Sequence, residues 1–229
     1  ALWNQSKEFS FELNLEPVRG LKILLTSNLT DSRTEQMQFM YEGNPTSFSG
    51  SYVRTHWAFM TAMRNSKAEN GYASEAFSNF LSYIPEMQRR VERQYSGTTY
   101  PTTGFFAGTP LAGAEYNPKD GGVSQTSPEV LIPAFIAAYS GTKPGKQSMK
   151  LFPGLASMRP NWRVTYDGLI NIGNLSKWFK TFTLSHAYQC TYSIGSYSSY
   201  MNWVSNGIGE NGYVMNELTQ MPSPSSPYN

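Results

Sequence analysis

Few residues of this chain are of a type that could do chemistry, and they stand far apart. The only two histidines are His56 and His186, and the only cysteine is Cys190. We find no set of Cys, Asp and His at ligand spacing around either histidine, so both are interpreted as packed or interfacial rings. Cys190 falls among the apolar positions of its segment, which favours a small packing residue. A single cysteine excludes an internal disulfide.

Carboxylates are few and mostly scattered. Glu8, Glu12 and Glu16 recur at every fourth residue on the polar side of an alternating segment, which suits the wall of a lumen. No serine-hydrolase, zinc-protease, phosphate-loop or dinucleotide motif occurs. A glycosidase could pair two distant carboxylates without a local motif, and this is the enzymatic alternative. We predict a protein that is not an enzyme, with no catalytic, cofactor-binding or metal site.

Basic residues are also scattered, with one exception. Arg89, Arg90 and Arg93 form a cluster in a chain whose formal net charge is +2. At this spacing the cluster is typical of a solvated helix face rather than of a nucleic-acid patch. We therefore expect no nucleic-acid partner.

The composition is poor in charge and rich in aromatic side chains. Charged residues make up 15% of the chain, against about 25% in an average soluble domain, and aromatic residues make up 14%. Amphipathic rings with small polar residues suit the wall of a β-barrel, and a secreted β-sandwich with a tyrosine-rich surface is the alternative. The sequence contains no run of about 18 apolar residues, so no membrane-spanning helix is predicted.

The most regular segment is 182–197. One side of the alternation carries large residues, and these are Phe182, Leu184, His186, Tyr188, Cys190, Tyr192 and Ile194. The alternation runs well beyond the about 5–6 residues of an average strand. It matches the about 9–11 residues of a strand that crosses a bilayer. The sequence therefore predicts one long transmembrane strand here.

Four further segments alternate and are predicted as strands: 9–15, 21–29, 47–60 and 161–169. Turns are expected at 17–20 and at 43–45, and weak alternation returns at Met37, Phe39 and Tyr41. If the strands run up and down in order, the stretch between the third and fourth leaves the sheet at the end that holds turn 17–20. The pair formed by 161–169 and 182–197 is predicted as a hairpin.

Two helices are predicted between these strands. Residues 72–95 carry an apolar stripe, with Ser74 as the N-terminal cap and Pro85 expected to kink or divide the helix. The second helix starts with Ser127 as cap and Pro128 at its first position, and it stops at Gly141. The intervening residues 96–125 are rich in Gly, Pro, Thr and Asn and predict a loop.

Four segments, in chain order, are similar to one known family: FSFELNLEPVRGLKI, PEVLIPAFIAAYSG, PNWRVTYDGL and LSHAYQCTYSIGSYSS. They resemble the SprA (Sov) family, the outer-membrane translocon of the type IX secretion system of Bacteroidetes, which is also associated with gliding motility. The matched positions include Glu16, Pro17, Leu21, Pro133, Ala134, Phe135, Pro160, Asn161, Trp162, Arg163, Tyr166, Gly168, Leu169, His186, Tyr188 and Tyr192. Gln189 and Cys190 stand where this family is expected to have Arg and Ser.

The resemblance implies a very large single-chain barrel that passes folded cargo proteins across the bacterial outer membrane. It also implies a PorV-like barrel partner at a lateral opening and a separate periplasmic plug protein. The chain would be an internal piece, whose partners are the rest of its own barrel chain, the PorV-like partner, the plug protein, secreted cargo and outer-membrane lipid. Such a piece exposes two unpaired edges.

The predicted fold class is therefore all-β: an antiparallel transmembrane β-barrel wall segment of about five to seven strands from a much larger barrel, with an inserted helical element. Residues 1–63 are predicted as barrel strands, 64–160 as a helical and loop insertion, 161–205 as a strand hairpin and 206–229 as a loop that is cut short. Another outer-membrane barrel for nutrient uptake or adhesion, and a soluble carbohydrate-binding β-sandwich, are the alternatives.

Overall fold

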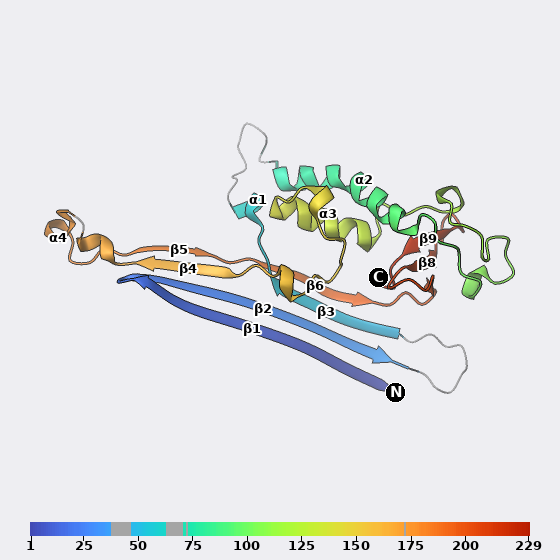
Figure 1. Cartoon of the computed structure of the whole chain (residues 1–229), viewed down its shortest axis with the longest axis horizontal. Coiled ribbons are helices and arrows are strands. Elements are labelled where there is room, and N and C mark those ends of the chain that lie inside the picture. Colours follow the sequence, from blue (N-terminus) through green and yellow to red (C-terminus); the bar gives the residue numbers. More distant parts are fainter. Residues whose placement is uncertain (38–46, 63–70, 72, 172) are drawn as a thin grey trace.

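The computed structural model describes residues 1–37, 47–62, 71, 73–171 and 173–229. Its main layer is a long antiparallel sheet, and two helices, α2 (Glu75–Tyr95) and α3 (Pro128–Ser140), lie over part of one face (Figure 1). A small second sheet forms near the C-terminus from β7 (Val204–Ser205), β8 (Gly212–Met215) and β9 (Pro222–Ser225). The predicted antiparallel β architecture with inserted helices is confirmed at this level.

In the described part of the chain the large sheet has four strand positions side by side, which we call rows. The first two rows are one long hairpin. β1 (Leu2–Val18) pairs with β2 (Leu21–Gln36), and the chain reverses at Gly20, which has a φ of 85°. Glycine is favoured there because of this positive φ, and a Cβ would also push against the carboxylate of Asp167, whose Oδ1 would lie 2.2 Å away. The turn at 17–20 is confirmed. Both strands extend beyond the predicted 9–15 and 21–29, because the backbone ladder continues where most side chains become polar on both faces, with Leu2 and Trp3 as exposed apolar exceptions.

The third row consists of two strands laid end to end along one edge of β2. β3 (Ser47–Thr55) pairs with its second half, with Leu29 opposite Arg54. β4 (Asn161–Tyr166) pairs with its first half, with Thr26 opposite Asn161. Both are antiparallel to β2, so they run in the same direction. The expected up-and-down order is wrong, and the stretch between them leaves from the middle of the sheet.

The fourth row follows this interruption. β5 (Leu184–Tyr188) pairs with β4, and β6 (Thr191–Ser198) pairs with β3. The single strand predicted over 182–197 is therefore broken at Gln189 and Cys190. At the break the N–H of Cys190 donates to Oδ1 of Asn161 at 2.9 Å, and the N–H of His56 donates to the carbonyl of Cys190 at 3.2 Å. The strand breaks because its partner row is interrupted there.

Two predicted strands were too long. The segment 47–60 stops being a strand at Thr55 and continues into the short helix α1 (Phe59–Ala62). The segment 161–169 stops at Tyr166, and its link to β5 holds α4 (Leu175–Trp178). The hairpin of β4 with β5 is confirmed. The turn predicted at 43–45 and the alternation at Phe39 and Tyr41 lie outside the described residues.

The two helices start and stop close to their predicted ends. In α2 the N–H of Phe77 donates to Oγ of Ser74 at 3.3 Å, and the helix runs through Pro85 without being divided. α3 begins at Pro128 and ends before Gly141, whose φ of 77° is left-handed. Short 3₁₀ turns punctuate the connections: η2 (Gly104–Phe106), η3 (Pro118–Asp120), η4 (Pro144–Lys146), η5 (Leu155–Ser157) and η6 (Gly168–Asn171).

An aromatic core holds the helices to the small C-terminal sheet. Tyr213 of β8 is fully buried, and its ring centroid lies 5.5 Å from that of Tyr95, 5.1 Å from Tyr100 and 5.3 Å from Phe106. The hydroxyl of Tyr95 also donates to the carbonyl of Gly212 at 3.1 Å. The loop predicted over 206–229 is therefore wrong in part, since two short strands in this Gly- and Pro-rich segment complete the core. None of the described helices is long and apolar enough to cross a membrane.

We define the helical unit as residues 73–157 together with the C-terminal segment 204–229 that packs on them. We expect Tyr213→Ala to destabilise this unit by about 3–5 kcal/mol, because it empties the centre of the ring cluster. Denaturant unfolding followed by near-ultraviolet circular dichroism measures the change. Tyr213→Phe is the matched control, since it keeps the ring and removes only the hydroxyl. An unchanged unfolding midpoint for Tyr213→Ala would show that β8 does not support the core.

Candidate functional site

The register of the large sheet sorts its side chains onto two contrasting faces. One rung across all four rows carries Leu13, Leu25, Trp162 and Tyr188. We define the apolar band as the residues that share this face over the same part of the sheet: Phe9, Phe11, Leu13, Leu15, Ile23, Leu25, Trp162, Val164 and Leu184. The sheet therefore presents a continuous apolar surface at the end that carries the Gly20 turn.

The apolar band is exposed to an unusual degree. Phe11 keeps 41% of its surface accessible, Leu15 43% and Leu184 58%. Soluble monomers rarely expose contiguous apolar patches of this kind, and such patches mark protein–protein or membrane interaction sites or ligand-binding grooves. The band is the strongest functional signal in the described part of the chain.

The opposite face carries mainly polar side chains, although the register also places Lys22, Arg163, Leu24 and Val53 on it. We define the polar face by its Ser, Thr and Asn residues, which include Ser6, Ser10, Asn14, Thr26, Asn28, Thr30, Ser32, Thr165, Ser185 and Ser193. Neighbouring strands bond across it, as when Oγ of Ser10 donates to Oδ1 of Asn28 at 3.0 Å. Such a surface is hydrated and offers little for an apolar protein surface to bind.

The three regularly spaced glutamates lie on this polar face and do not form a catalytic pair. Successive Cα atoms at this spacing are about 13 Å apart along a strand. Oε1 of Glu12 accepts from Nδ2 of Asn14 at 3.0 Å, and Oε1 of Glu16 accepts from the N–H of Gly20 at 3.2 Å. Their carboxylates are thus distributed along the face, as the sequence predicted for a wall.

The helical unit covers the other half of the same face that carries the apolar band. Tyr52 of β3 packs on Phe152, with ring centroids 5.4 Å apart. Phe152 also contacts Tyr197 of β6 at 4.8 Å. The indole N–H of Trp57 donates to the carbonyl of Pro160 at 2.8 Å. The two ends of the long insertion are thereby tied to the sheet beside the point where they leave it.

Arg54 lies at the centre of this junction and is only 1% exposed. Its Nη1 donates to the carbonyl of Pro153 at 2.9 Å and to Oγ of Ser157 at 3.0 Å, and its Nη2 donates to the carbonyl of Ser157. No ion pair involves it within the described residues. A buried cation is costly unless its donors are satisfied, so the carbonyl groups of the 153–157 segment take the place of water.

The two histidines have different surroundings. His186 belongs to the apolar-band side of β5, where Nε1 of Trp162 donates to its Nδ1 at 3.2 Å and the two rings stack. His56 lies outside the apolar band, beside Arg54, with Nδ1 3.4 Å from Nη2 of that arginine. Burial lowers the pKa of His56 to about 4, and the charges of Arg54 and Arg159 act in the same direction. His56 is a packed ring, whereas His186 is exposed and stacks on Trp162 at the sheet surface; neither has a ligand set around it within the described residues.

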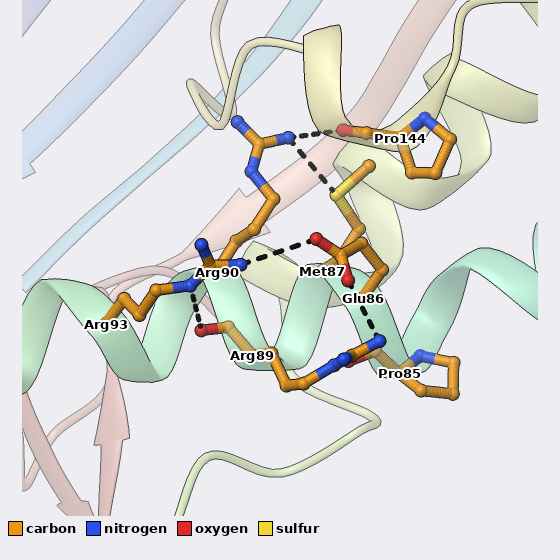
Figure 2. A network of polar contacts seen from close by, with 7 residues as sticks. All are labelled: Pro85, Glu86, Met87, Arg89, Arg90, Arg93 and Pro144. Atoms are coloured by element: carbon orange, nitrogen blue, oxygen red, sulfur yellow. Dashed lines mark hydrogen bonds and ion pairs between the residues drawn. The ribbon is translucent and has the colours of Figure 1, made fainter.

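The arginine cluster of α2 does not form one basic surface. Figure 2 shows Arg89 and Arg93 converging on Glu86, at 2.9 Å and 3.3 Å, while Arg90 turns the other way. Nη1 of Arg90 donates to the carbonyl of Pro144, which ties α2 to the segment after α3 (Figure 2). Two cations thus share one anion on an exposed helix face, which is the surface predicted from the spacing.

One hollow of about 640 Å³ is lined by two carboxylates, Glu129 and Glu210. Both already have structural partners. Oε1 of Glu129 accepts from the backbone N–H of Ser226, and the hydroxyl of Tyr228 donates to Oε1 of Glu210 at 2.5 Å. They hold the C-terminal segment against the helical unit. Across the described residues, no three His, Cys, Asp or Glu side chains are grouped so that they could hold a metal ion.

The sequence located the two faces of the sheet but missed the junction. Arg54 shares a face with Phe48, Tyr52 and His56, and neither face of that segment is cleanly polar. An arginine among the aromatic residues of this predicted strand was the available signal. The groups that accept its hydrogen bonds are about a hundred residues away in the chain, so the sequence does not reveal them. Comparison with known proteins adds no further guide, because no protein family and no characterised protein matches the chain significantly.

Arg54→Met tests the junction. We expect it to loosen the helical unit from the sheet by about 1–3 kcal/mol, because the Ser157 carbonyl loses its donor and the Pro153 carbonyl keeps only the hydroxyl of Tyr52. Hydrogen exchange at residues 151–157 should become faster. Arg159→Met is the control, since that exposed arginine lies over the ring of Trp57 and donates no hydrogen bond found among the described residues to the 151–157 segment. Equal protection in both variants would contradict the role given to Arg54.

The low pKa of His56 predicts a pH dependence. Between about pH 6.5 and pH 4 the unfolded chain binds a proton that the folded chain does not, so stability falls as the pH is lowered through this window. His56→Gln should lose that part of the dependence. Unfolding midpoints are measured from pH 7 to pH 4 for the wild type and the variant. The difference between the two curves isolates the contribution of His56, because both proteins carry the same carboxylates. His186→Gln should retain the pH dependence of stability. An identical loss in both variants would refute the assignment of that dependence to His56.

Proposed function

We propose that this chain forms part of the wall of a large transmembrane β-barrel, with the apolar band toward lipid and the polar face toward the lumen. The contrast between the two faces of one sheet carries the proposal. A barrel wall needs this contrast, because alternate residues of each strand meet lipid on one side and water on the other.

The length of the apolar band agrees with this role. A register shift after Leu15 brings Val18 opposite Leu21, which continues the band to the turn. From Phe9 to Val18 the strand rises by about 30 Å at about 3.3 Å per residue. With the about 40° tilt of barrel strands this spans about 23 Å, close to the apolar band of about 25 Å that barrels expose.

The edges of the sheet support the same proposal. Within the described residues β1 pairs only with β2, so its other edge of 17 residues has no partner. In lipid every backbone polar group needs a partner, which neighbouring strands of a closed barrel would provide. In plain buffer the same edge would favour aggregation.

The resemblance to the SprA (Sov) family makes the proposal more specific. We propose a segment of the outer-membrane translocon of the type IX secretion system, which exports folded proteins and takes part in gliding motility. The polar face would line the conduit, and its small hydroxyl and amide groups would let cargo pass without binding. The rest of the barrel chain, a PorV-like barrel and a periplasmic plug protein are the proposed partners. The helical unit lies beside the polar part of the strands, outside the apolar band.

A pair of substitutions in β1 tests the wall. Leu13→Arg places a charge in the apolar band and should cost about 2–4 kcal/mol of stability in phosphatidylcholine vesicles. Ser10→Arg, on the polar face of the same strand, is the matched control and should cost little. Urea unfolding of the vesicle-bound chain measures both. A chain that is monodisperse in plain buffer and tolerates Leu13→Arg would instead favour a soluble β-sandwich.

The identity as a translocon has a separate test. Extension of the reading frame on both sides into many further alternating strands would support it. A short complete gene with its own signal peptide would contradict it.

A further inference from the structure

The link between β4 and β5 carries exposed aromatic side chains beyond the end of the apolar band. Trp178 is 82% exposed, Phe179 48% and Phe182 36%. The link leaves the sheet beside the Gly20 turn, where the N–H of Asp167 donates to the carbonyl of Gly20 at 3.0 Å. Figure 1 shows α4 at the far end of the sheet from the helical unit. Neither hydrophobic core found among the described residues includes these rings.

Basic side chains alternate with the aromatic ones. Lys177 and Lys180 flank Trp178 and Phe179, both are exposed, and neither forms an ion pair in the part of the chain that the structure describes. Trp and Phe rings next to lysines are typical of segments that lie at the boundary between hydrocarbon and headgroups. There the rings enter the apolar edge and the ammonium groups meet phosphates.

The position of these residues agrees with such a boundary. Phe182 precedes Leu184 of the apolar band by two residues, which places it just outside the start of β5. Phe179 packs edge-on against Phe182, with ring centroids 5.7 Å apart. The aromatic pair thus lies at the margin where the band ends.

We propose that residues 173–182 form an anchor that lies in the headgroup layer of the membrane, with Trp178, Phe179 and Phe182 toward the hydrocarbon and Lys177 and Lys180 on anionic phosphates. The anchor rests on the proposed wall function, because the apolar band sets the depth at which the link meets lipid. It fixes the height of this end of the sheet in the bilayer.

Depth-dependent fluorescence tests the anchor and the wall separately. In a Cys190→Ser background, an environment-sensitive fluorophore is attached at Trp178→Cys, at Leu13→Cys or at Leu218→Cys. Leu218 is the matched control, because it is an apolar residue with 95% exposure on the helical unit. The chain is bound to vesicles of phosphatidylcholine and phosphatidylglycerol that carry quenchers at the headgroup or deep in the acyl chains.

We expect the label at position 178 to be quenched by headgroup quenchers, the label at 13 by acyl-chain quenchers and the label at 218 by neither. Deep quenching at 13 with none at 178 would overturn the anchor and leave the wall. Headgroup quenching at 178 with none at 13 would support the anchor and overturn the wall. Equal quenching at 178 and at 218 would mean that the β4–β5 link faces water or protein. That result would refute the anchor.

Charge variants test the lysines. Lys177→Gln with Lys180→Gln should weaken binding to the anionic vesicles by roughly tenfold or more, because each lysine near an anionic surface contributes about fivefold. Binding to pure phosphatidylcholine should change little. Lys143→Gln with Lys146→Gln removes the same charge from exposed sites on the helical unit and should leave binding unchanged. Equal effects of the two pairs would contradict a local role of Lys177 and Lys180.

Discussion

The long edge of β2 is the constraint on which the remainder of the sheet depends. Its 16 residues offer one uninterrupted row of backbone donors and acceptors, and β3 and β4 share that row end to end. An insertion of about a hundred residues can therefore leave the middle of the sheet without breaking the sheet, because β1 and β2 continue past the gap. The fourth row adapts by breaking at Gln189 and Cys190, where the backbone groups bond to Asn161 and His56 instead.

An insertion that leaves from the middle of a sheet has to be held against it, and Arg54 provides the polar part of this contact. The guanidinium replaces water by backbone carbonyl groups of the returning chain, while Tyr52 and Phe152 exclude solvent around it. The same burial lowers the pKa of His56, and the positive charges of Arg54 and Arg159 add to that effect. Packing, hydrogen bonding and protonation are thus coupled at one junction, which joins the helical unit to the strands.

The division of the sheet into a covered half and an exposed half follows from this geometry. The helical unit covers the face over β3 and β6. In this half of the sheet the side chains of β1 and β2 are mainly polar. The apolar band over β4 and β5 stays uncovered, between the junction and the exposed rings of the β4–β5 link. For a wall in a membrane this arrangement separates a lipid-facing zone from a zone that carries a folded unit in water. Both zones are paired to the same continuous hairpin of β1 and β2, so their relative position along the sheet cannot change without breaking that pairing.

The sequence by itself determined the local features whose cause is local. Period-two alternation located the strands and their faces, Gly20 and Gly141 marked a turn and a helix end, and Ser74 and Pro128 marked helix starts, because each depends on backbone geometry within a few residues. Only the tertiary structure decided which strands share an edge. Alternation says which face a residue takes, but it carries no information on partners, so β3 and β4 looked like successive full strands and the break in 182–197 was invisible. The place of Tyr213 in the core and the acceptors of Arg54 were likewise beyond the sequence, because both depend on contacts between segments about a hundred residues apart.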